Sequence, residues 1–124
     1  PTTYPAMLRS YNIQKKVAKV GFDYKSNIEA INKIIEEANE LKIALKGNNK
    51  KKIKEELGDL IFASLDVSRK LNLNPETVLS KSNYKFSKRW KYIEKLMITK
   101  NKNINTIGTK KLNQLWIKSK KLVS

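Results

Sequence analysis

The side chains with the clearest chemistry are carboxylates, and they gather in one stretch of a basic chain. Six of the eleven acidic residues lie within residues 33–60, although the formal net charge is +16. They include two pairs with a spacing of three residues, Glu37 with Glu40 and Glu56 with Asp59. On a helix this spacing places both members of a pair on one side. Each pair can therefore present two carboxylates to the same point.

The residues between the two pairs predict how the pairs meet. Gly47, Asn48 and Asn49 favour a turn, so the flanking helices should fold back antiparallel and bring the pairs face to face. Four converging carboxylates repel one another unless a cation lies between them. Because the ligands are hard oxygens, the pattern predicts Mg²⁺, with Mn²⁺ as the alternative, rather than zinc.

The composition limits the other kinds of chemistry. The chain has 124 residues, the length of a single domain, and it contains neither Cys nor His. Disulfides, thiol catalysis and zinc fingers are thereby excluded, and acid–base catalysis must use carboxylates, lysines, tyrosines or water. No apolar run is long enough to cross a membrane, and the first residues lack the apolar segment of a signal peptide. We expect a cytoplasmic protein without a membrane partner.

The positive charge gives an alternative interpretation. A basic helical module without turnover, binding nucleic acid or another partner, would use its lysines to neutralise phosphates. However, only three of the 27 basic residues are arginine, Arg9, Arg69 and Arg89. Arginine is the better residue for bidentate contacts to phosphates and bases, so its scarcity argues against a nucleic-acid partner.

The hydrophobic pattern predicts helices throughout and no strand of any length. Helices are expected over residues 6–20, from the Ser26 cap to the turn at Gly47, over 50–71, over 74–97 and over 110–122. In the second helix, an apolar stripe recurs at helical spacing: Ile28, Ile31, Ile35, Ala38, Leu41 and Leu45. The predicted fold is an all-α bundle of four main helices plus a short C-terminal helix.

The third of these helices also predicts an oligomer. Its C-terminal half, GDLIFASLDV at residues 58–67, is apolar on most sides, which indicates burial on more than one face. A chain of this size cannot cover such a helix alone, so we expect a homodimer.

Several strings together resemble one family. In chain order they are GFDY (21–24), KIIEEANEL (33–41), the run EELGDLIFASLDVSRKLNLNPETVLSKSNYKFSKRW (55–90) and NQLW (113–116). They resemble the MazG nucleoside triphosphate pyrophosphohydrolases, and most closely the catalytic C-terminal half of the two-domain enzyme. The chain would then be a single MazG-like domain over 1–124, with a two-domain parent chain as one possibility. Tyr24 stands where an aromatic Trp is more usual.

The resemblance implies the roles of individual residues. It places the metal and the catalytic carboxylates at Glu37, Glu40, Glu56 and Asp59. Substrate contacts carry over to a second set: Lys33, Glu36, Lys52, Glu55, Lys85, Arg89, Trp116 and Lys120. The implied activity is hydrolysis of a nucleoside triphosphate to the monophosphate and pyrophosphate, by attack of water on the α-phosphorus. Glu36 or Glu40 is the expected general base.

Each of these assignments has a structural alternative. The acidic pairs could be solvated partners of neighbouring lysines, such as Lys33 and Lys52. Against this, Asp59 lies among Leu57, Leu60 and Ile61, where an unpaired buried carboxylate would be costly. Trp116 could be a core residue instead of a stacking partner for the base. A regulatory domain without turnover is a third alternative, and the preferred nucleotide (canonical, damaged or alarmone) stays open.

Overall fold

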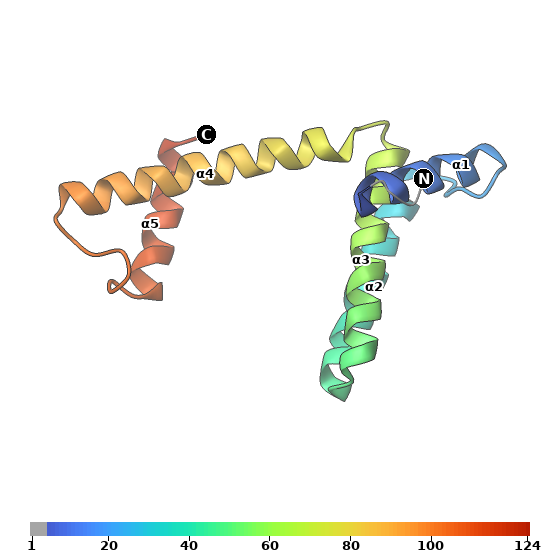
Figure 1. The fold of residues 1–124 in the computed structure, drawn as a ribbon, viewed down its shortest axis with the longest axis horizontal. Coiled ribbons are helices and arrows are strands. Elements are labelled where there is room, and N and C mark those ends of the chain that lie inside the picture. The colour runs from blue at the N-terminus through green and yellow to red at the C-terminus, as the bar shows by residue number, and fades with distance from the viewer. Residues whose placement is uncertain (1–4) are drawn as a thin grey trace. The chain divides into compact units, whose positions relative to one another are not determined.

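The computed structural model describes residues 5–124, and within them all regular structure is α-helical (Figure 1). The helices are α1 (Ala6–Lys19), α2 (Asn27–Gly47), α3 (Lys50–Lys70), α4 (Pro75–Thr99) and α5 (Thr109–Leu122). This confirms the predicted all-α class. The described chain forms two compact units, of which the first ends at Pro75 and the second begins at Glu76.

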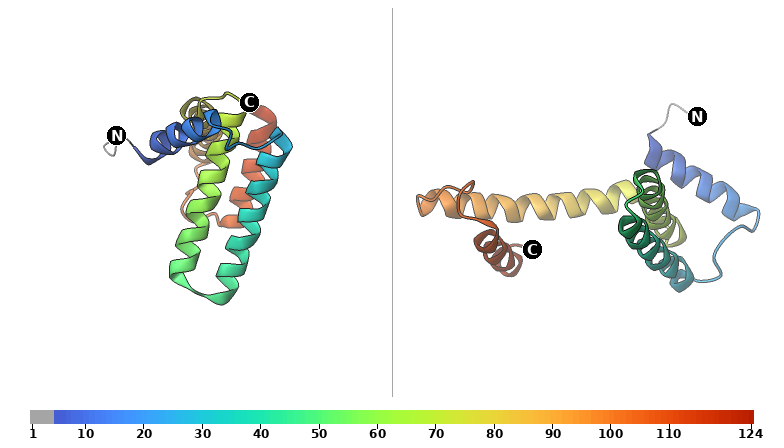
Figure 2. Two further views of the ribbon diagram at one scale, coloured as in Figure 1. Left: turned by 90° about the vertical axis from the view of Figure 1, so that its right-hand side faces the viewer. Right: turned by 90° about the horizontal axis from the view of Figure 1, so that it is seen from below.

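The first unit is built on an antiparallel hairpin of α2 and α3, which lie side by side (Figure 2). The ends of these helices follow from local chemistry. Ser26 caps α2, because its hydroxyl accepts a hydrogen bond from the Glu29 N–H at 3.2 Å. The Glu29 carboxylate reaches the N–H of Lys25 at 3.0 Å, one residue before the cap of the predicted capping box.

The turn between α2 and α3 uses two asparagines. Asn48 ends α2 in the left-handed conformation, with φ of 53°, which asparagine tolerates better than most residues. Asn49 then caps α3, because its side chain accepts a hydrogen bond from the Lys52 N–H at 3.2 Å. This cap supports a helix start whose three lysines, residues 50–52, oppose the helix dipole.

Small side chains form the contact between α2 and α3. The buried positions of α2 are Ala30, Glu37 and Ala44, and Ala63 is among those of α3. Alanines allow two helix backbones to approach closely. Part of the apolar stripe predicted for α2 is exposed, namely Ile28, Ile31 and Ile35, whereas Ala38 and Leu41 of the stripe are half-buried. The stripe thus predicted the helix correctly, but its isoleucines are not buried.

The first helix packs against α3, and a buried polar contact fixes it there. Gln14 is the buried residue of α1, and its amide Nε2 donates to the Phe62 carbonyl of α3 at 2.9 Å. The loop after α1 is tied to the end of α3 by ion pairs. Arg69 donates to Asp23 and to Asp66, both at 2.8 Å, and Lys70 pairs with Asp23 at 3.3 Å.

The second unit has its own apolar core. Ile93 and Met97 of α4 pack with Leu115 of α5, and half-buried side chains surround this cluster, among them Trp90 and Trp116. Ile93 and Met97 lie four residues apart on α4 and are buried, whereas Leu79 and Phe86 of the same helix are exposed. Within residues 5–124, no helix has the length and apolar character needed to cross a membrane.

Candidate metal centre

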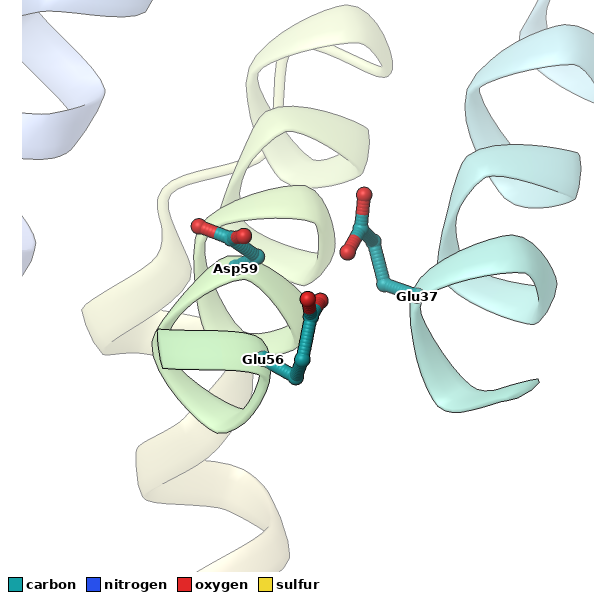
Figure 3. Close-up of side chains that lie close together, drawn as sticks. All are labelled: Glu37, Glu56 and Asp59. Carbon is teal, nitrogen blue, oxygen red and sulfur yellow. The ribbon is translucent and has the colours of Figure 1, made fainter. Parts of the chain in front are cut away.

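Three carboxylates from the two hairpin helices converge at one point. Glu37 extends from α2 toward α3, where Glu56 and Asp59 lie one helical turn apart (Figure 3). One oxygen atom from each of these side chains lies within 4.8 Å of the others. The antiparallel hairpin therefore brings Glu37 of one predicted pair together with both members of the other pair.

The exposure of these carboxylates differs from the sequence-based expectation. Glu37 and Glu56 are 6% and 5% exposed, whereas Asp59 is exposed. The argument that Asp59 lies buried among apolar neighbours was therefore wrong. Burial is therefore costly for the two glutamates and not for Asp59. The side chains of both glutamates lie between α2 and α3, which contact each other through alanines.

Lysines neutralise the buried glutamates only in part. Lys33 approaches Oε1 of Glu37 at 3.1 Å, and Lys52 approaches Oε1 of Glu56 at 3.4 Å. In both glutamates the second oxygen, Oε2, is buried and has no hydrogen-bond partner within the described chain. An unpartnered buried carboxylate oxygen is unfavourable, and a bound cation would remove that cost. This donor set fits a divalent cation with oxygen ligands.

Glu40 lies at the edge of this centre. The pKa of Glu40 is raised above its ordinary value, because a hydrogen bond with Glu56 and the charges of Glu37 and Glu56 favour its protonated form. Its side chain is exposed, and it does not belong to the group of three oxygens described above. The four predicted carboxylates are thus neighbours, with Glu40 nearest to Glu56.

The other predicted residues of the hairpin flank the centre. Lys33 bridges Glu36 at 3.2 Å as well as Glu37, and these partners raise the pKa of Lys33, Glu37 foremost. The pKa of Lys52 is also raised, through its hydrogen bond to Glu56. Glu55 is exposed on α3. The ion pairs offered as a structural alternative therefore do form, but they leave Oε2 of both buried glutamates unpartnered.

The remaining predicted residues belong to the second unit. Phe86 of α4 packs against Trp116 of α5, with ring centroids 4.7 Å apart, and the Arg89 guanidinium lies over the Trp116 ring at 6.0 Å. Arg89 also donates through Nε to the Val123 carbonyl at 3.1 Å. Lys85 and Lys120 are exposed. Trp116 is half-buried against the core cluster, and its role as a stacking partner for the base stays a prediction.

Sequence reasoning missed several residues that shape this region. Asp23, Asp66 and Arg69 join the loop before α2 to the end of α3, and Gln14 joins α1 to α3. The partners of Gln14 and Asp23 are 46 to 48 residues away in the chain, so local spacing does not reveal them, whereas Asp66 and Arg69 form an i,i+3 pair. One signal was available, since Arg69 is one of only three arginines in a chain whose other basic residues are lysine.

These observations define an all-α protein with a carboxylate centre between two antiparallel helices. The family model of the MazG nucleotide pyrophosphohydrolase domain matches residues 25–93, which include both acidic pairs. The chain belongs to this family. The match covers more than half of the chain and confirms the resemblance recognised in its sequence.

Curated relatives give the same family over a longer stretch. The nucleoside triphosphate pyrophosphohydrolase of Escherichia coli (strain K12) is 30% identical over 118 residues, which are 94% of this chain and 45% of that protein. The nucleoside triphosphate pyrophosphohydrolase/pyrophosphatase MazG of Thermotoga maritima is 36% identical over 116 residues, 94% of this chain and 44% of that protein. The uncharacterized protein YabN of Bacillus subtilis is 31% identical over 68 residues. The chain spans less than half the length of the first two relatives.

Proposed function

We propose that this chain hydrolyses nucleoside triphosphates to the monophosphate and pyrophosphate, by attack of water on the α-phosphorus. One observation carries the proposal: Glu37, Glu56 and Asp59 converge within 4.8 Å, while Oε2 of both glutamates is buried without a partner. Family membership and the names of the two relatives matched over 94% of this chain support the same activity.

In this proposal Glu37, Glu56 and Asp59 hold a divalent cation, Mg²⁺ or Mn²⁺, and Glu40 lies close enough to join them. When bound, the cation neutralises charge on the phosphate oxygens. Lys33 and Lys52 hold Oε1 of the two buried glutamates, so each glutamate keeps its orientation. These two lysines, with Glu36 and Glu55, stand at the rim, where substrate would enter.

Four residues of the second unit stay proposed substrate contacts, as the family resemblance implies: Lys85, Arg89, Trp116 and Lys120. Lys85 and Lys120 are exposed and can pair with phosphates, and Arg89 supplies a planar guanidinium for the same purpose. Trp116 offers a face on which a base can stack, provided that Phe86 and Arg89 leave part of the ring free. A homodimer is part of the proposal, and so is a cytoplasmic location.

Glu40 is the proposed general base, in preference to Glu36. Its carboxylate is exposed beside Glu56 and is free to face a water molecule, whereas Glu36 is paired with Lys33. A fourth metal ligand is the other role for Glu40. The two roles predict different kinetics, because loss of a base lowers kcat at any metal concentration, whereas loss of a ligand raises the concentration of metal required.

The test is release of pyrophosphate from a panel of triphosphates with Mg²⁺ varied. The wild type should turn over only with metal, and Asp59→Asn should lower kcat/KM at least about 100-fold while circular dichroism and the melting temperature stay unchanged. Glu94→Gln removes one carboxylate from the exposed surface of α4 and should have no effect. Metal-independent release, or an Asp59→Asn variant as active as the wild type, would overturn the proposal.

A further inference from the structure

A pocket of about 380 Å³ lies where the ends of α1 and α3 meet the loop between α1 and α2. Its lining is mainly basic: Lys15 and Lys19 come from α1, and Arg69 and Lys70 come from the end of α3. Asp23 of the loop is the one carboxylate among the described residues that line it. Four cations and one carboxylate leave an excess of positive charge, so the pocket favours an anion.

Arg69 is the buried side chain of this pocket, with 9% exposure. Its Nε donates to Asp66 and its Nη2 donates to Asp23, both at 2.8 Å. These two bonds hold the plane of the guanidinium in a fixed orientation. Because a guanidinium carries five N–H donors, the two aspartates do not exhaust it. Arg69 therefore keeps donors for a further acceptor.

Asp23 does not neutralise the lysines of α1, because it already accepts from Arg69. Among residues 5–124, neither Lys15 nor Lys19 forms an ion pair with a carboxylate. The Lys15 ammonium lies over the ring of Tyr11, 5.8 Å from its centroid, and Tyr11 also lines the pocket. Two cations of the pocket are thus available to a ligand.

A structural role for these lysines would be to compensate the negative ends of two helices. The backbone already satisfies carbonyls at both ends, however. The N–H of Gly21 donates to the Ala18 carbonyl and that of Asn72 to the Arg69 carbonyl, both at 3.0 Å. Lys15 also lies a full turn before the last residue of α1, and the effect of the helix dipole is confined to the last turn. Capping therefore does not account for Lys15.

The pocket is separate from the carboxylate centre, although both include residues of α3. Arg69 follows Asp59 by ten residues, which corresponds to roughly 15 Å along a helix axis. The two sites also differ in charge. The carboxylates of the centre repel a phosphate when no metal is bound, whereas the cations of the pocket attract one without metal. Binding in the absence of metal therefore distinguishes the two sites.

We propose that this pocket binds a multiply charged phosphate group without a metal ion. Arg69 supplies planar N–H donors to the phosphate oxygens, and Lys15 and Lys19 supply point charges. Cations from two helices suit an anion with several charged oxygens, such as pyrophosphate or the phosphates of a nucleotide, better than a single carboxylate. The inference goes beyond the proposed function, because binding here requires neither the carboxylate centre nor turnover.

Arg69 can be observed directly, because the chain contains only three arginines. In ¹⁵N-labelled protein, the Nε–H resonances of the other two are assigned by their loss in Arg9→Lys and Arg89→Lys. Inorganic pyrophosphate in EDTA should shift the Arg69 resonance until the site is saturated, and sodium chloride at the same ionic strength should not. An Arg69 resonance that pyrophosphate leaves in place, or that sodium chloride shifts equally, contradicts the proposal.

A pair of double variants separates the pocket from the net charge of the chain. Lys15→Gln together with Lys19→Gln should raise the Kd for pyrophosphate at least about tenfold. Lys16→Gln together with Lys42→Gln removes the same charge from exposed positions that do not line the pocket, and should change the Kd less than about twofold. Equal weakening in the two double variants would show that binding follows net charge and that the pocket is not a site.

Three ligands identify the source of the phosphate group. In EDTA, pyrophosphate and cytidine triphosphate should both shift the Arg69 resonance, and cytidine, which has no phosphate, should not. A shift with the triphosphate alone assigns the pocket to nucleotide phosphates, and a shift with cytidine refutes recognition of phosphate. If pyrophosphate shifts Arg69 but no triphosphate is cleaved in Mg²⁺, the proposed function fails and the pocket stands. Cleavage in Mg²⁺ with an unshifted Arg69 in EDTA gives the opposite result.

Discussion

Glu37 and Glu56 are the residues at which stability and function are opposed. Each is nearly fully buried, each has one oxygen paired to a lysine, and each leaves Oε2 without a partner. Burial of a charged oxygen without a partner destabilises the metal-free fold. A protein under selection for stability alone would replace such residues, so their presence between two packed helices indicates a ligand.

Glu56→Gln should therefore separate the two effects. Without metal, we expect the variant to be more stable than the wild type by about 1 kcal/mol, because repulsion with Glu37 and Glu40 is relieved. Saturating Mg²⁺ should stabilise the wild type by about 2.7 kcal/mol at 100 times its Kd, and the variant much less. Urea denaturation in EDTA and in Mg²⁺ measures both quantities. Equal stabilisation of both proteins by Mg²⁺ would place the cation elsewhere.

At the scale of elements, the loop before α2 is held by charge. Arg69, at the end of α3, donates to Asp23 and Asp66, and Lys70 also reaches Asp23. The hydrogen bond from Arg69 lowers the pKa of Asp23 to about 2, against its ordinary value of 3.8. This network fixes the loop that carries Tyr24 against the end of α3.

The lowered pKa of Asp23 gives a defined pH dependence. The unfolded chain binds a proton at Asp23 near pH 4, whereas the folded chain does so near pH 2, so the contribution to stability is present above pH 4 and is lost as the pH falls toward 2. Asp23→Asn should be less stable than wild type at pH 7 by about 1 kcal/mol, after allowance for partial solvent exposure.

Urea denaturation of the two proteins at several pH values measures this difference. It should shrink between pH 4 and pH 2 and disappear at the acid end. Glu94→Gln, an exposed change on α4, serves as the control and should follow the wild type throughout. A difference between Asp23→Asn and wild type that is independent of pH would show that the ion pair does not stabilise the loop.

Helix ends were more predictable from the sequence than helix faces. Ser26, Asn49 and Pro75 act through their own backbone neighbourhood, so their positions in the sequence are sufficient to place the ends of α2, α3 and α4. The turn predicted at Gly47, Asn48 and Asn49 is confirmed, and Asn48 is its residue with positive φ. The face of α2 that meets α3 depends on the other helix, and apolar periodicity does not identify that partner.

The candidate site was also predictable only in part, because local spacing is visible in the sequence and contacts between helices are not. The spacing of the two acidic pairs predicted that four carboxylates converge, and the antiparallel hairpin brings three of them together, Glu37, Glu56 and Asp59, without Glu40. Burial of Glu37 and Glu56, and exposure of Asp59, were not predictable, since they depend on how closely α2 and α3 approach. The hydrogen bond from Gln14 could not be predicted for a similar reason, because it is made with the Phe62 carbonyl of another helix, α3.

At the scale of the whole molecule, the first unit has too little apolar core for its size. Among residues 5–74, the buried apolar side chains are Ala30, Ala44, Ala63 and Leu65. Three of these four contribute only a methyl group. A unit of this length normally requires a larger core or an additional partner to remain folded. The missing apolar surface is present in the sequence, but it lies on the outside of α2 and α3.

The exposed apolar residues of the hairpin point to a second copy of the chain as that partner. Ile28, Ile31 and Ile35 recur along α2 at 66%, 40% and 55% exposure, and Leu57 and Ile61 are 46% and 51% exposed on α3. Exposed apolar stripes of this kind on neighbouring helices mark interaction surfaces. We expect a homodimer in which these residues are buried, and the proposed centre then lies close to the interface.

Ile35→Lys tests this expectation, because a lysine in an apolar interface leaves its charge without a partner. The wild type should sediment as a dimer at micromolar concentration, and the variant should shift to the monomer and lose several degrees of melting temperature. Ile98→Lys makes the same change at an exposed position of α4, 78% exposed, and should remain dimeric. Since an obligate dimer has no stable folded monomer, the melting temperature of the wild type should rise with protein concentration. If the wild type sediments as a monomer and its melting temperature does not depend on concentration, Ile28, Ile31 and Ile35 remain exposed to solvent and the expected dimer does not form.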